Sequence, residues 1–114
     1  MCQDTSQQLV ELLCHTRIDD FNKARETMEA PSIRGASLEG VDLRGMNARG
    51  LDMRDCHLRR ADLRGLDLSQ TLLAGASICG AKISGVLFPT EFSAEEINLS
   101  LVHGTRLRPR PKDG

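Results

Sequence analysis

The sequence predicts an all-β solenoid, a short stack of coils, with a helical segment at each end. Two observations predict the coils: apolar residues recur at every fifth position through residues 33–89, and glycine follows most of them two residues later. A strict short period is typical of a stacked repeat, in which each unit buries its apolar side against its neighbours. A third observation, a capping-box motif before and after this segment, predicts the helices.

Two columns of the five-residue repeat are expected to point inward. The central column contains Leu38, Leu43, Ala48, Met53, Leu58, Leu63, Leu68, Leu73, Ile78, Ile83 and Phe88. The column two residues earlier contains Ala36, Val41, Met46, Leu51, Cys56, Ala61, Leu66, Thr71, Ala76, Ala81 and Val86. Two inward residues and a turn-permissive glycine describe a short extended piece followed by a corner. Repeated corners would stack the chain at about the 4.8 Å spacing of paired strands.

These motifs resemble the pentapeptide repeat family, whose pattern is approximately Ala-(Asp/Asn)-Leu-x-x. Ala61-Asp62-Leu63-Arg64-Gly65 matches the pattern as it stands, residues 41–45 and 66–70 are close to it, and about eleven tandem units follow the period. The resemblance implies a right-handed, four-sided β-helix with four repeats per coil, so that residues twenty apart stack on one face. The departures from the pattern, which suggest locally irregular packing, are Ala48, Met53, Thr71, Leu72 and Lys82.

The segments that flank the repeats are expected to cap the two open ends of the stack. Residues 1–32 would form an N-terminal helical cap, with a capping box at 5–8 and a stop at Pro31. Residues 90–104 would form a C-terminal cap helix that begins at a second capping box and ends at Gly104. Residues 105–114 contain two prolines and four basic residues, and we expect them to be a flexible basic tail.

The composition argues against several classes of protein. The formal net charge is −1, so no global charge attracts the chain to nucleic acid or membrane, and the absence of Trp and Tyr removes base-stacking platforms. No apolar run is long enough to span a bilayer, and no secretory leader is recognisable. The four cysteines lack metal-binding spacing. We therefore expect a cytoplasmic protein with free thiols, no cofactor and no metal.

Arginine follows the central apolar residue in five successive repeats. These residues, here called the arginine waist, are Arg44, Arg49, Arg54, Arg59 and Arg64. Four repeats per coil would place them around the stack as a ring, whereas a nucleic-acid groove needs bases on one side. Nucleic acid is therefore an unexpected partner. Two interpretations remain open: a solvated waist paired with the aspartates two residues earlier, or a surface that binds an acidic partner protein.

The C-terminal end of the repeats is a second candidate binding surface. An open stack exposes its interior at both ends, which must be capped or bound by a partner. The candidate residues here are Leu87, Phe88, Ile97 and Leu101. They either close the end within the chain, which is slightly favoured, or bind a second copy to form a homodimer. Leu87 falls in an outward column, so its exposure would indicate an interface.

Catalytic and metal sites have little support in the sequence. Cys56 falls in an inward column and is expected to be a core residue, while Cys79 falls in an outward column. Cys14 and His15 are adjacent, and only His57 and His103 could join them as further histidines. Structural roles are favoured for all of these residues. We therefore expect that the protein is not an enzyme.

The preferred function is a non-enzymatic protein–protein interaction or scaffold module, with another protein as its partner. The alternative is a DNA-mimic modulator of DNA gyrase or topoisomerase, of the quinolone-resistance type. The resemblance implies this alternative because DNA mimicry is the best-known activity of pentapeptide repeat proteins. Mimicry of DNA needs an acidic rod, whereas the repeats hold eight basic and six acidic residues. The alternative is therefore ranked second.

Overall fold

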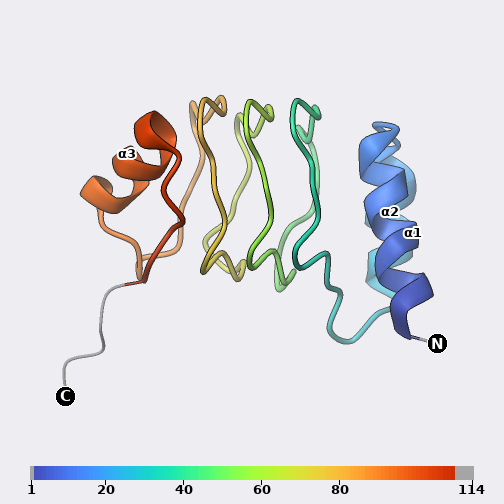
Figure 1. Cartoon of the computed structure of the whole chain (residues 1–114). Helices are drawn as coiled ribbons and strands as arrows, with labels where there is room; N and C mark the ends of the chain where they lie inside the picture. The colour runs from blue at the N-terminus through green and yellow to red at the C-terminus, as the bar shows by residue number, and fades with distance from the viewer. Residues whose placement is uncertain (1, 110–114) are drawn as a thin grey trace, which may run out of the picture.

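A computed structural model describes the backbone of residues 2–109 and the side chains of residues 7–109 (Figure 1). It contains the helices α1 (Cys2–Cys14), α2 (Ile18–Glu26) and α3 (Ala94–His103). Helices α1 and α2 lie together at one end of the repeats, and α3 lies at the other end (Figure 1). Among the described residues, no helix has the length and apolar character needed to cross a membrane.

The predicted all-β solenoid is wrong. Within residues 2–109, the regular secondary structure consists of three helices, and the repeats contain isolated single-residue bridges with no multi-residue strand and no sheet. The same finding overturns the right-handed, four-sided β-helix that the resemblance implied. The physical reason is that almost every repeat contains a turn. One residue between successive turns pairs with the neighbouring coil, and a single pair is too short to form a strand ladder.

The repeats form stacked coils (Figure 1). The single bridges join each coil to the next. Every bridge is parallel and joins residues twenty positions apart, as Asp42 with Asp62 and Asp62 with Lys82. In the first of these, the N–H of Leu43 donates to the C=O of Asp62 at 3.0 Å, and the N–H of Asp62 donates to the C=O of Val41 at 2.9 Å. Four repeats therefore complete one coil.

The interior of the coils is filled by the two inward columns. Leu43, Leu63 and Met53 are fully buried, and so are most other members of both columns. Cys56 is buried, its thiol donates to the C=O of Ile33 at 3.1 Å, and burial raises its pKa to about 11. Members at the two ends of the columns are partly buried and pack against the helices and the core: Ala36, Val41, Ile83, Val86 and Phe88.

The N-terminal helices cover one end of the stack. Helix α1 begins at Cys2, before the expected capping box, and Leu9, Leu13 and Phe21 of α1 and α2 are fully buried. Asn22 of α2 contacts the backbone of the first coil, as does Arg25. The backbone of this coil is therefore held by helical side chains as well as by its neighbouring coil.

Helix α3 and the segment after it cover the other end. One half of the expected capping box is present, since the Ser93 hydroxyl accepts from the N–H of Glu96 at 3.1 Å, whereas the Glu96 carboxylate accepts from the N–H of Arg108. Gly104 ends the helix with φ 74°. The buried Ser100 hydroxyl accepts from the N–H of Ile78 at 3.1 Å. Leu107, which falls within the expected tail, is buried and bonded to the third coil. Residues 110–114 of that tail lie outside the described residues.

Candidate functional site

Three repeats share an aspartate–arginine clamp on their outer surface. In residues 62–64, one carboxylate oxygen of Asp62 accepts from the backbone N–H of Arg64 at 3.2 Å and from its Nε at 2.9 Å. The other oxygen accepts from Nη2 at 2.7 Å. The pairs Asp42–Arg44 and Asp52–Arg54 have the same geometry. The aspartate thus orders the turn and holds the guanidinium against the coil.

Asp62 is the one of these three aspartates that pairs with two arginines of the described residues. Its side chain is only 13% exposed, and it pairs with Arg64 of its own coil and with Arg44 of the preceding coil. The side-chain hydrogen bonds from Arg64 are the main cause that lowers the pKa of Asp62 to about 2, and the charge of Arg44 acts in the same direction. The clamp therefore also connects neighbouring coils.

The arginine waist is divided into clamped and unclamped members. Arg44, Arg54 and Arg64 are clamped, which supports the solvated, paired interpretation for these three. Arg49 and Arg59 make no ion pair with any described side chain, and both are exposed. The reason lies two residues earlier, where asparagine and histidine replace the aspartate. Within the arginine waist, Arg49 and Arg59 are therefore the members whose guanidinium is not held by an aspartate of the described residues.

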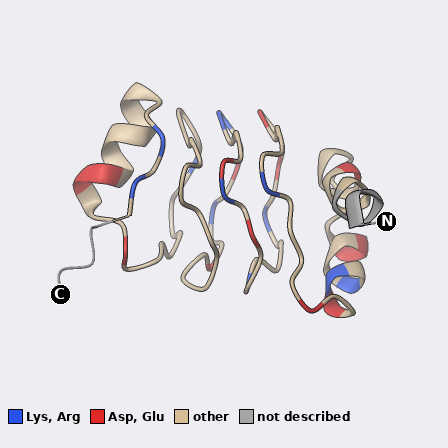
Figure 2. Cartoon of the chain, turned by 60° about the horizontal axis from the view of Figure 1, so that its bottom comes forward, with Lys and Arg blue, Asp and Glu red and all other residues tan. Residues whose placement is uncertain are grey.

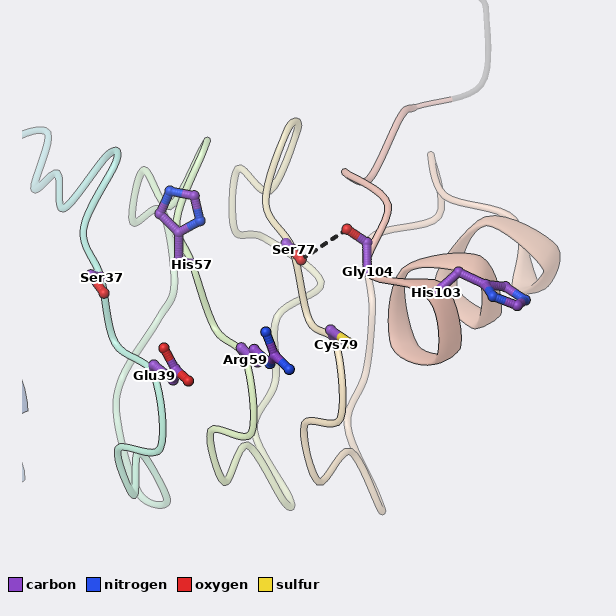
Figure 3. Close-up of a pocket in the computed structure, with 8 residues that line it drawn as sticks. All are labelled: Ser37, Glu39, His57, Arg59, Ser77, Cys79, His103 and Gly104. Carbon is purple, nitrogen blue, oxygen red and sulfur yellow. Dashed lines mark hydrogen bonds between the residues drawn. The ribbon is translucent and has the colours of Figure 1, made fainter.

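A groove crosses the coils on the face that contains Arg59 (Figure 3). It has a volume of about 660 Å³. Its lining residues are Ser37, Glu39, His57, Arg59, Ser77, Cys79, His103 and Gly104. The first six form two rows of residues twenty apart, and the last two come from the end of α3. The Ser77 hydroxyl approaches the C=O of Gly104 at 3.4 Å, which closes one end of the groove.

The groove brings together residues that the sequence left unconnected. His57, Cys79 and His103 line it, whereas Cys14 is exposed at the end of α1, on the opposite side of the repeats from α3 (Figure 1). The spacing from His57 to Cys79 is 22 residues and that from Cys79 to His103 is 24 residues, and neither corresponds to a recognisable motif. Residues 57 and 79 line the same groove because the coil returns after twenty residues, and residue 103 borders it through the position of α3, although its imidazole points away from the other two (Figure 3). No cluster able to hold a metal ion occurs among the residues that the structure describes.

The C-terminal candidates are separated by the structure into buried and exposed residues. Ile97, Leu101 and Phe88 pack against the core of the same chain and are partly buried. Leu87 is 58% exposed, as expected from its outward column, and its role in an interface stays a prediction. Three further large apolar residues, which sequence reasoning did not select, are exposed: Leu72, Leu99 and Val102. Leu72 had a detectable signal, because it replaces the usual aspartate or asparagine of its column.

Charges of both signs are distributed along the coils (Figure 2). Three of the aspartates in the outward column are held by arginines in the clamps described above. The coils therefore lack the continuous acidic surface that mimicry of DNA requires.

Comparison with known proteins identifies the repeats. The family described as Pentapeptide repeats matches residues 36–75 and 56–88, with eight copies. No curated protein and no solved structure matches the chain. The matched residues coincide with the coils whose bridges are twenty residues apart and whose two inward columns are buried. Residues 36–88 of the chain therefore consist of repeats of the pentapeptide repeat family.

Proposed function

We propose that the protein is a non-enzymatic interaction module that binds another protein through its C-terminal end. One observation carries the proposal: among the described side chains, the exposed large apolar residues all lie in the third coil or in α3. They are Leu72, Leu87, Leu99 and Val102. The rest of the repeat surface presents polar and charged residues instead. Exposed apolar residues gathered at one end of a small protein are typical of an interface.

The coils provide a rigid base for such an interface. Leu72 and Leu87 occupy outward positions, and their backbones are bridged to Asp52 and Asp67 of the preceding coil. Side chains on a pre-ordered backbone lose little further conformational freedom when a partner binds. A second copy of this chain is the partner we propose first. The exposed Leu99 and Val102 lie on α3, at the same end of the stack as the third coil (Figure 1).

The proposal is tested by replacing exposed apolar residues at this end. Leu87→Ser and Val102→Ser are compared with Lys82→Ser, an exposed position in the same coil and the same outward column as Leu87. Sedimentation velocity measures self-association, and chemical crosslinking in native lysate followed by mass spectrometry identifies another partner. We expect both leucine and valine variants to weaken the association at least tenfold and Lys82→Ser to leave it unchanged. Equal behaviour of all three variants contradicts the proposal.

A further inference from the structure

Arg59 differs from its neighbours in the arginine waist in what holds its guanidinium. Arg54 and Arg64, before and after it in the same coil, are each clamped by an aspartate at 2.8 Å and 2.7 Å. Residue 57 is histidine, so Arg59 has no such clamp and makes no ion pair with a described side chain. An unpaired guanidinium presents its planar fork of N–H donors to a carboxylate or phosphate.

The surroundings of Arg59 form a groove rather than a flat surface (Figure 3). One row across the coils contains Ser37, His57 and Ser77, and the parallel row contains Glu39, Arg59 and Cys79. The row of Ser37, His57 and Ser77 has no aspartate, whereas each of the other three faces has one at this position. Hydroxyl and imidazole groups spaced along the coils offer hydrogen bonds to an extended ligand. The segment at Gly104 closes the groove beside the third coil.

We propose that this groove binds an acidic peptide segment of a partner protein, with a carboxylate side chain of the peptide on Arg59. The groove carries both signs of charge, because Glu39 stands in the same row as Arg59. A peptide satisfies both groups, since its carboxylate pairs with the guanidinium and its backbone N–H groups donate to Glu39. A phosphate dianion concentrates negative charge beside Glu39 and is disfavoured there. The groove shares no residue with the apolar C-terminal surface, so either site can fail without the other.

Binding is measured by fluorescence anisotropy with a fluorescein-labelled peptide of alternating glycine and glutamate. The control peptide has glutamine in place of glutamate. We expect Arg59→Gln to weaken binding of the acidic peptide at least tenfold, Arg59→Lys to weaken it less, and Arg64→Gln to change it less than twofold. Arg59 makes no side-chain hydrogen bond among the described residues, so its replacement leaves the fold intact, which circular dichroism verifies. Equal affinity for both peptides, or equal losses in Arg59→Gln and Arg64→Gln, overturns the proposal.

Two further measurements locate the peptide and its chemistry. Cys79 lines the groove and Cys14 is exposed on α1, so both alkylation rates can be followed by peptide mapping after treatment with N-ethylmaleimide. We expect the acidic peptide to slow alkylation of Cys79 and not of Cys14.

Inorganic phosphate is added in competition with the peptide, with chloride at equal ionic strength as its control. Protection of neither thiol, or displacement of the peptide by phosphate and not by chloride, overturns the assignment of the groove to an acidic peptide.

Discussion

The side-chain amide of Asn22 in α2 pairs with the backbone of Asn47 in the first coil. Its Oδ1 accepts from the N–H of Asn47 at 2.8 Å, while its Nδ2 donates to the C=O of Gly45 at 3.1 Å. The guanidinium of Arg25 donates to the C=O of Asn47 at 3.3 Å and to that of Arg49 at 2.7 Å. Helical side chains thus bond both backbone groups of Asn47.

The register of the coils explains why a helix takes this place. In the bridge of Asp42 with Asp62, the later residue turns both its N–H and its C=O toward the preceding coil. By the same register, Asn47 turns both groups toward the N-terminal end, where no earlier coil precedes it. An amide and a guanidinium can supply the missing acceptor and donor. Helix α2 therefore stands in for a preceding coil at this corner.

Asn22→Ala is expected to lower the free energy of unfolding by about 1–3 kcal/mol, because it leaves backbone groups at an end of the stack without partners. Urea denaturation followed by circular dichroism measures the change. Asn98→Ala is the matched control, since Asn98 is also an asparagine in a helix but is exposed. If the two variants lose the same stability, Asn22 does not hold the first coil.

Asp62→Asn is expected to destabilise the protein near neutral pH and to matter progressively less in acid. The folded pKa of Asp62 is about 2, below the value of about 3.9 in an unfolded chain. Its contribution is therefore complete above the unfolded pKa and is lost as the pH falls from about 4 toward 2. Urea midpoints of the wild type and the variant are compared between pH 7 and pH 2. Glu91→Gln, an exposed carboxylate without an ion pair among the described side chains, is the control.

Gly75→Ala is expected to destabilise the protein more than Gly50→Ala. Both glycines have left-handed backbone conformations, with φ of 82° and 71°, so each substitution costs about 1–2 kcal/mol. At residue 50 a Cβ meets open space, whereas at residue 75 it overlaps the carboxylate of Asp55, which pairs with Arg34 at 3.1 Å. Urea unfolding should show an additional loss of about 1–3 kcal/mol at residue 75.

A second background separates the two causes of this loss. Asp55→Gly removes the carboxylate, and glycine suits the φ of 63° at that position. In the Asp55→Gly background, we expect the excess cost of Gly75→Ala to disappear while the cost of Gly50→Ala stays the same. An excess that persists would mean that the overlap with Asp55 is not its cause.

Leu107→Ala is expected to lower the free energy of unfolding by about 2–3 kcal/mol. The side chain of Leu107 is 1% exposed, its C=O accepts from Gly75 at 2.7 Å, and its N–H donates to Ala76 at 2.8 Å. Leu99→Ala in α3 removes an equal volume from an exposed position and should change stability by less than about 0.5 kcal/mol. Thermal and urea unfolding report the difference. Similar small losses in both variants would mean that residue 107 belongs to a mobile tail.

Much of the repeat organisation could be predicted from the sequence because it depends on local spacing. Leu43 and Leu63 are inward for the same reason, that each is the central residue of a five-residue unit. The exposure of Leu87 follows from its place in an outward column. The class of secondary structure was nevertheless wrong, because a five-residue period specifies inward and outward positions without specifying how many residues pair between corners.

The amino-acid sequence alone establishes the tandem repeats, their inward columns and the signals at both ends of α3. The candidate sites depend on the tertiary structure. His57 and Cys79 line one groove only because a coil returns after twenty residues, and His103 borders that groove only because α3 lies beside the third coil. Likewise, Asn22 acquires its role from the unpaired edge beside it. Periodicity depends on the spacing of residues that are close in the sequence, whereas a groove or a cap requires segments that are distant along the chain to come together in space.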